Sequence, residues 1–260
     1  MCGLVVHCCF ACREQCWLHC SQLHTVVNDC LEELQCGNVG GVERERQDSR
    51  YRLSFTVGGL LLSQGVVCAR RFVDSHPQPD TPDAQVGAEI TSIRDEIVDS
   101  NALAIRTTSA NKRVTAEVCK RLSALSFAEL GFLASAESSM QDCRYLMWMA
   151  MCRYYLFVGE FATEVLRERF LLGETIALDD YDRYVLNKAM WHPELEAISA
   201  ATASKLRGNV FKAMREAGLI ERGSQGADVI VPAVFGQRLA GLERDNAASW
   251  LFFPSRDRMN

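Results

Sequence analysis

Residues 140–172 decide the fold, and their first half contains the run Tyr145-Leu-Met-Trp-Met-Ala-Met-Cys152. This run is apolar on every side of a helix, which is typical of a central helix surrounded by other elements. Its methionines and aromatic residues indicate packed core rather than a cofactor site. We expect the helix to become amphipathic after Phe161 and to end near Gly173. Arg153 is expected at an edge of the core, paired with an acid such as Glu160.

Shorter helices are expected on both sides of this central one. Residues 51–72 read as one or two short helices broken near the glycines. Residues 83–99 carry apolar side chains at helical spacing and predict an amphipathic helix. Similar patterns predict helices over 109–123, 126–136, 175–190 and 202–217, the last ended by Gly218.

The last part of the sequence predicts a hairpin. Two β-capable runs, 219–222 and 229–231, are joined by a glycine-rich turn, and a short helix is expected over 232–242. Helix, helix and hairpin in this order are typical of a winged helix. The sequence therefore predicts a mainly α fold, a helical bundle with a C-terminal winged-helix portion that carries a small β-hairpin. We expect a helical domain over 50–173, a winged-helix-like domain over 174–245 and a C-terminal tail over 246–260.

The composition excludes several classes of protein. Of 260 residues, 48% are hydrophobic and 23% charged, which excludes a disordered or collagen-like chain. The longest apolar stretch, residues 145–158, is too short to cross a bilayer and contains Arg153. We expect a cytoplasmic protein with no membrane partner. The net charge of −5 does not favour a nucleic-acid partner, so such a role must rest on a local basic patch.

The cysteines are concentrated at the start of the chain. Eight of the twelve lie in the first 36 residues, and composition changes abruptly at the Gly37–Gly41 stretch. We interpret residues 1–42 as a Cys-rich extension, disordered or created by a mis-assigned start upstream of Val42. The alternatives are a disulfide framework or a zinc knuckle, whose ligands would be Cys9, Cys12, Cys16 and Cys20 with His19 or His24. The knuckle spacing is unusually short, so we expect no metal and no cofactor.

No local motif indicates catalysis. The sequence has no GxGxxG, P-loop, GxSxG or HExxH motif. His192, beside Trp191, is interpreted as a packed helix-end histidine. We therefore expect a protein that is not an enzyme.

Two basic clusters are the candidate binding sites. The first lies on the helix over 202–217 and extends into the hairpin; its members are Lys205, Arg207, Asn209, Lys212, Arg215 and Arg222. The second surrounds the helix over 109–123; its members are Arg106, Lys112, Arg113, Lys120 and Arg121. Basic helical faces beside a wing suit phosphate contact and groove readout. The alternative is a solvated helix face, in the second cluster with Glu117 as a partner.

Four stretches resemble one family. They are Tyr51-Arg-Leu-Ser-Phe-Thr-Val-Gly-Gly-Leu-Leu-Leu; Asn101-Ala-Leu-Ala-Ile-Arg-Thr-Thr-Ser-Ala-Asn-Lys-Arg; Leu146-Met-Trp-Met-Ala-Met-Cys-Arg-Tyr-Tyr with Glu160-Phe-Ala; and Trp191-His-Pro-Glu-Leu with the pattern from Thr202 to Leu219. Together they resemble BrxA of the bacterial BREX (bacteriophage exclusion) phage-defence loci, from about Tyr51 to Leu239.

The resemblance implies a helical, non-enzymatic DNA-binding protein, similar in part to the antitermination factor NusB and carrying a winged-helix portion. It implies double-stranded DNA as a partner. It also implies a place beside the other BREX proteins: an ATPase, a DNA methyltransferase and an alkaline-phosphatase-like protein. The family offers no residue-level DNA site, so the basic residues above rest on helical geometry alone. Two alternatives stay open: a scaffold that docks the ATPase or methyltransferase, and an RNA-binding protein.

Overall fold

The computed structural model describes residues 50–55, 57–75, 83–223 and 226–255. Contacts within the chain group residues 50–260 as one compact unit. The predictions made for residues 1–42, including the zinc knuckle, lie outside the described residues. The division of the unit into domains over 50–173 and 174–245 stays a prediction.

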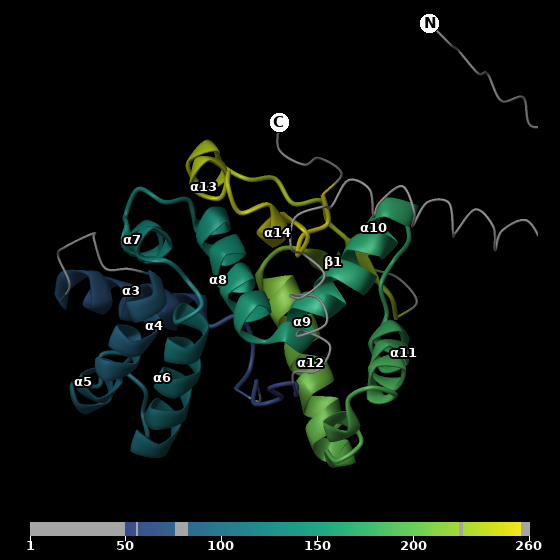
Figure 1. Cartoon of the computed structure of the whole chain (residues 1–260), viewed down its shortest axis with the longest axis horizontal. Helices are drawn as coiled ribbons and strands as arrows, with labels where there is room; N and C mark the ends of the chain where they lie inside the picture. Colours follow the sequence, from purple (N-terminus) through teal and green to yellow (C-terminus); the bar gives the residue numbers. More distant parts are fainter. Residues whose placement is uncertain (1–49, 56, 76–82, 224–225, 256–260) are drawn as a thin grey trace, which may run out of the picture. The chain divides into compact units, whose positions relative to one another are not determined.

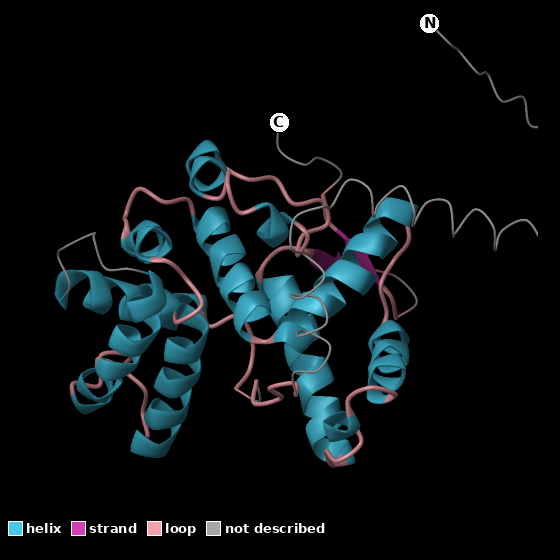
Figure 2. Ribbon diagram, in the orientation of Figure 1, coloured by secondary structure: helices cyan, strands magenta, loops and turns pink. Residues whose placement is uncertain are grey.

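The structure is mainly α with one small hairpin, which confirms the predicted fold class (Figure 2). The helices of the first half are α3 (Leu62–Ser75), α4 (Asp83–Ser92), α5 (Arg94–Asp99), α6 (Thr108–Leu122), α7 (Phe127–Ala134) and α8 (Met140–Tyr154). They are followed by α9 (Leu156–Phe161), the π-helix η1 (Ala162–Arg167), α10 (Glu168–Leu172), α11 (Leu178–Ala189), the 3₁₀ turn η2 (Pro193–Leu195) and α12 (Ala200–Glu216). Strands β1 (Ile220–Arg222) and β2 (Asp228–Ile230) precede α13 (Gln237–Leu242) and α14 (Ala247–Trp250) (Figure 1).

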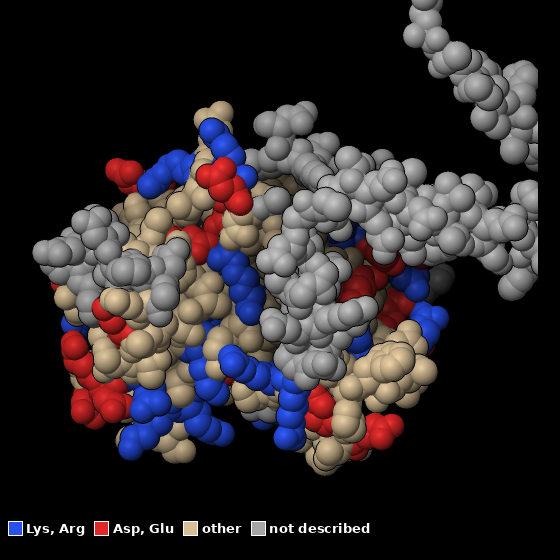
Figure 3. Space-filling view, in the orientation of Figure 1, with Lys and Arg blue, Asp and Glu red and all other residues tan. Residues whose placement is uncertain are grey.

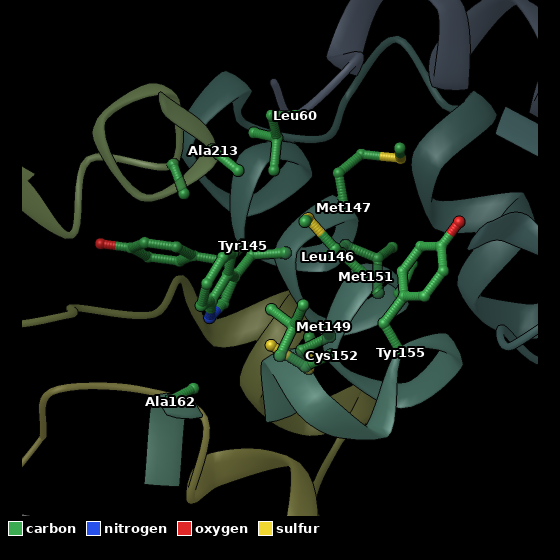
Figure 4. Close-up of a cluster of buried hydrophobic side chains, with 14 of the residues drawn as sticks. Leu60, Tyr145, Leu146, Met147, Met149, Met151, Cys152, Tyr155, Ala162 and Ala213 are labelled. Atoms are coloured by element: carbon green, nitrogen blue, oxygen red, sulfur yellow. The ribbon is translucent and has the colours of Figure 1, made fainter. Parts of the chain in front are cut away.

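Helix α8 is the centre of the core, as its sequence predicts. Every side chain from Tyr145 to Cys152 is buried, and Trp148 is completely enclosed. Leu60, two residues before α3, and Ala213 from α12 reach the same cluster as Leu146 and Met149 (Figure 4). A helix that is apolar on all sides is therefore surrounded on all sides.

The expected helix over 140–172 is interrupted after Tyr154. Tyr155 has an extended backbone, with φ −105° and ψ 90°, and α9 starts beyond it. The turn brings Gly159 against α8, where an added Cβ would lie 2.8 Å from the Cys152 carbonyl oxygen. Only a glycine fits so close to that backbone.

The interruption explains why the predicted pairing of Arg153 with Glu160 is wrong. On one continuous helix these two residues, seven positions apart, would share a face. Instead Arg153 pairs with Glu129 of α7, at 2.6 Å, and with Glu243, at 2.8 Å. Glu160 pairs with Lys188 of α11, at 2.6 Å, and accepts a hydrogen bond from the Tyr51 hydroxyl.

The described residues 51–55 and 57–61 form no helix, contrary to the expectation of short helices from residue 51 onward. Residues 50–55 and 57–61 run as an irregular segment, called the strap below, and α3 begins at Leu62. Gly59 and Leu61 have left-handed backbones, with φ of +77° and +59°, which are incompatible with a right-handed helix. Phe55 and Leu60 of the strap are nevertheless buried in the core.

The hairpin forms where the sequence predicts it. Gly218, at φ +75°, ends α12, and β1 pairs antiparallel with β2 in the register Ile220↔Ile230. Ile176, which precedes α11, forms a further antiparallel bridge with Asp228 of β2. The sheet is thereby extended by one residue from the segment between α10 and α11.

Candidate nucleic-acid interface

Helix α6 presents one basic stripe to solvent. Thr107 caps the helix by accepting a hydrogen bond from the Ala110 backbone N–H. Lys112 and Arg113 are exposed, and Lys120 is half-buried. At about 100° per residue these three side chains fall within one side of the helix. Arg106 is exposed just before the helix begins.

Arg121 does not belong to this stripe, which corrects its prediction as a DNA-contacting residue. It lies nine residues after Lys112, on the opposite side of α6, and its side chain is completely buried. Its Nε atom pairs with Glu117 at 2.9 Å. Its Nη1 atom donates to the carbonyl oxygens of Gly59, at 2.7 Å, and Leu60, at 3.2 Å. Glu117 is thus a partner within this cluster, as the alternative interpretation expected, but the pair is buried and does not lie on a solvated face.

Tyr155 completes the buried network around this ion pair. Its hydroxyl donates to the Glu117 carboxylate, 2.9 and 2.8 Å from the two oxygens. Burial raises the pKa of Tyr155 well above its usual value, and the negative charge of Glu117 raises it further. The hydroxyl therefore stays protonated and remains a donor to the carboxylate.

The polar face of α12 is exposed to solvent in its first half and contacts the strap in its second half. In the first half Ala201, Ser204, Lys205 and Gly208 are exposed. In the second half the strap lies over the face, and the Asn209 Nδ2 atom donates to the Phe55 carbonyl oxygen at 2.9 Å. The apolar stripe predicted for this helix, from Leu206 to Ala217, is buried.

Other basic residues of the α12 cluster are paired with acids of the chain itself. Arg207 forms an ion pair with Asp182 of α11. Arg215 pairs with Asp228 of β2 at 2.5 Å and also lies over the Phe211 ring. Lys212 has Glu216 at 3.7 Å, while Arg222 is exposed on β1. Lys205 and Arg222 are thus the cations of this cluster that have no ion pair among the described residues.

The strap connects the two basic clusters. On one side the Lys120 Nζ atom lies 3.5 Å from the Ser54 hydroxyl oxygen. On the other, a Cβ at Gly58 would lie 3.8 Å from the Lys212 Nζ atom. Lys and Arg side chains gather over α6 and over the strap on the face drawn in Figure 3. The two clusters, about ninety residues apart in sequence, meet the same short segment.

Arg52 joins this surface and was missed by the sequence reasoning. It is exposed on the strap, and its guanidinium carbon lies 5.2 Å from the centre of the Tyr154 ring. The sequence shows Arg52 only as a single charge in the mainly apolar stretch that follows Tyr51. Because this stretch is predicted to be helical, the charge does not indicate a binding surface.

His192 is packed rather than poised for chemistry, as predicted. It is buried, its ring stacks on Tyr51 at 3.8 Å between centroids, and its Nδ1 atom lies 3.3 Å from Glu194 Oε1. Within the described ranges, no cluster of three or more His, Cys, Asp or Glu side chains could hold a metal ion. A search of the same residues finds no helix with the length and apolarity needed to span a bilayer.

Comparisons with known proteins identify the family. The chain is 26% identical over 129 residues to the BREX protein BrxA of Escherichia coli O9:H4 (strain HS); the match covers 49% of this chain and 60% of that relative's length. A crystal structure of an uncharacterized protein from Magnetospirillum magneticum has the same fold, with a TM-score of 0.61 at 18% identity, over 78% of this chain and 96% of that one. The family model of BrxA matches residues 49–242, well over half of the sequence, and the protein therefore belongs to the BrxA family.

Proposed function

We propose that this protein is a non-enzymatic, cytoplasmic accessory protein of a BREX phage-defence system that binds double-stranded DNA. The observation that carries the proposal is the basic surface joined by the strap. Lys112, Arg113 and Lys205 have no ion pair among the described residues, so their charge is available to phosphates. The name of the E. coli relative supports the BREX assignment.

The order of elements around α12 supports a winged-helix mode of binding. Ile176, α11, α12, β1 and β2 follow one another, and Ile176 pairs with β2. In helix-turn-helix proteins the N-terminal residues of the recognition helix contact base edges. In α12 this half carries small exposed residues, Ala201, Ser204 and Gly208, beside Lys205, and these would let the helix approach a major groove closely.

The test is the salt dependence of duplex binding by the full chain. Each phosphate neutralised by a lysine or arginine contributes about −0.9 to the slope of log affinity against log salt. The double variant Lys112→Ala/Arg113→Ala should therefore flatten the slope by about 1.8. Lys205→Ala should flatten it by about 0.9 and weaken binding at every salt concentration.

A matched control also removes two positive charges, but from arginines that form ion pairs within the protein. Arg207→Ala/Arg215→Ala changes the net charge equally, but both arginines already face acids of the chain. We expect a much smaller change in slope. Equal flattening by the two double variants, or no flattening by either, contradicts the proposed surface.

A second candidate function is a scaffold for another BREX protein, such as the ATPase, the methyltransferase or the alkaline-phosphatase-like protein. It is favoured by large apolar side chains at the end of α11: Leu186, Met190 and Trp191 are 69%, 76% and 77% exposed. Such side chains are enriched where proteins meet. A pull-down with each purified BREX protein, with and without Leu186→Ser/Trp191→Ser, tests this role. Competition of duplex DNA by RNA separates the RNA-binding alternative.

A further inference from the structure

The strap is held from the α6 side by a buried cation. The Arg121 guanidinium donates to the carbonyl oxygens of Gly59 and Leu60, and its Nη2 atom lies 3.5 Å from that of Val57. Glu117 orients the same guanidinium through its Nε atom. Because the arginine is fully buried, water cannot replace these carbonyls as acceptors.

The strap is held from the α12 side by an acid. Glu216 Oε2 accepts a hydrogen bond from the Leu60 backbone N–H at 2.5 Å. An added Cβ at Gly59 would lie only 2.4 Å from the same oxygen, so the carboxylate and the glycine are in close contact. The two charged side chains thus bind the same peptide group, between Gly59 and Leu60: Arg121 donates to its carbonyl oxygen and Glu216 accepts from its N–H.

The strap is a fixed part of the core rather than a removable cover. Phe55 and Leu60 are buried, and the Phe55 ring meets Tyr155 edge-on, with centroids 5.1 Å apart. The left-handed backbone of Leu61, unlike that of a glycine, costs free energy and is maintained only where the surrounding contacts demand it. Motion of the strap away from α12 would expose these side chains, so the strap holds its place between the two helices.

We propose that Arg121 and Glu216 are positioning residues that form a clasp, setting the distance between the basic stripe of α6 and the exposed half of α12. This inference rests on the proposed function, because the distance matters for binding only if both faces meet one duplex. Neither residue touches DNA. The clasp acts by keeping the two faces at a fixed separation, so that the second contact, which is intramolecular once the first has formed, is made at a high effective concentration.

The clasp is tested first without DNA. Genetically encoded spin-label residues at Ser109 and Ser204, both exposed, report the α6–α12 distance without reacting with the cysteines. Wild type should give a narrow distance distribution. Glu216→Ala, Gly59→Ala and Arg121→Lys should each broaden it, the last because a lysine lacks the planar fork that reaches several acceptors. Glu221→Ala, an exposed acid on β1, is the matched control and should leave the distribution narrow.

The same variants are then compared on two lengths of duplex. The short probe is a duplex of about 8 base pairs, on the order of 27 Å, which under this proposal meets one basic face at a time, and the long probe of about 24 base pairs covers both. Glu216→Ala should weaken long-duplex binding about tenfold while leaving short-duplex binding unchanged or slightly tighter. Loss of a negative charge alone would tighten the binding of both duplexes, and general destabilisation of the protein would weaken the binding of both. The ratio of the two affinities therefore reports only the effect of positioning the two faces.

The outcomes separate the two proposals. Narrow distributions in Glu216→Ala and Gly59→Ala, or equal broadening in Glu221→Ala, overturn the clasp. Failure of the wild-type protein to bind either duplex overturns the proposed function, while the distance distributions still decide the clasp. Circular dichroism of every variant confirms that the helices have formed, and any variant that has lost them is replaced by Glu216→Gln, which keeps an acceptor oxygen but no charge.

Discussion

Basic residues of this protein divide by where they lie around a helix. Lys112 and Arg121 are both basic residues of α6, but they lie on opposite sides of the helix. Lys112 faces solvent, while the Arg121 side chain is completely buried. The same rule divides α12, where Lys205 is exposed and Arg207 turns towards Asp182. A count of positive charges therefore overstates the surface available to a nucleic acid.

This division predicts opposite effects on stability. Arg121→Ala leaves the Glu117 carboxylate buried without its cation and should lower the free energy of unfolding by about 3–5 kcal/mol. Lys112→Ala removes an exposed charge and should change it by less than about 0.5 kcal/mol. Urea denaturation followed by circular dichroism measures both. Similar losses for the two variants would contradict the assigned burial of Arg121.

The burial of single residues could be predicted from the sequence where it follows the helical period. It could not be predicted where it depends on partners far away in the sequence. The 3.6-residue period identified the buried stripe of α12, from Leu206 to Ala217. It could not identify the partners of the opposite face, because Phe55 is 154 residues from Asn209. In α6 the helical period could not separate Arg121 from Arg113, which lies eight residues earlier and only about 80° away around the helix. What encloses Arg121 is its contacts with Glu117 and with the distant carbonyl of Gly59.

At the scale of elements, α7, α8 and the end of α13 are joined by one buried charged group. Arg153 pairs with Glu129 and Glu243, and its Nη2 atom also donates to the Ser249 hydroxyl at 2.7 Å. Burial, together with the hydrogen bond and negative charge of the neighbouring Glu129, raises the pKa of Glu243 to about 8 against the opposing charge of Arg153. Glu129, with its pKa lowered, stays ionised, so the two carboxyl groups share one arginine and one proton.

A pH dependence of stability follows. A carboxyl group with a raised pKa in the folded state holds its proton there after the unfolded chain has lost it, so folding is favoured at low pH. The Glu243 contribution is complete below the unfolded value near 4.5 and is lost as the pH rises to about 8. Glu129 has the opposite sign, and its contribution falls away only in acid.

Thermal unfolding of wild type and Glu243→Gln between pH 5 and 8.5 measures the effect. The wild-type midpoint should fall across this range, and the variant, which cannot titrate there, should show a flatter profile. Parallel profiles for the two proteins would contradict the assigned proton on Glu243.

At the scale of elements the sequence also predicted more than it missed. The central helix, the helices expected over 109–123, 126–136, 175–190 and 202–217, and the hairpin lie close to their expected positions. The helix expected over 83–99 is instead divided into α4 and α5, and the one expected over 232–242 begins only at Gln237. The break at Tyr155 could not be read from the sequence, since nothing local forbids a helix there. Its surroundings are the distant Glu117, which accepts from the Tyr155 hydroxyl, and the close approach of Gly159 to the Cys152 carbonyl. The strap was read as helix because its apolar residues resemble a helix pattern, although they are buried from an irregular backbone.

Within the whole molecule, the end of the described chain returns to the central helix. The Trp148 indole N–H donates to the Phe252 carbonyl oxygen at 2.9 Å, and Phe253 is completely buried against Tyr145. Ser249 and Phe253 are therefore buried, although the sequence predicts this segment only as part of a C-terminal tail.

Removal of residues 247–260 should consequently destabilise the protein. Loss of one buried phenylalanine alone costs about 3–5 kcal/mol. The single variant Phe253→Ala should account for most of this loss, while Leu251→Ala, at a partly exposed position, should cost much less. Guanidinium denaturation of the three variants measures the difference, and equal stability of the truncated and complete chains would contradict the packing described.

The strap also determines how late in synthesis the protein can complete its folding. Leu60 and Glu216, which bond to each other, are separated by 156 residues, so the N-terminal part leaves the ribosome long before its α12 partner exists. Until then the apolar side chains of Phe55 and Leu60 lack part of their final surroundings. Contacts between such distant residues slow folding. The nascent chain is thus prone to aggregation until α12 has been synthesised. Its synthesis should therefore depend more on chaperones than that of a helical bundle of the same size in which each helix packs on its neighbours in sequence.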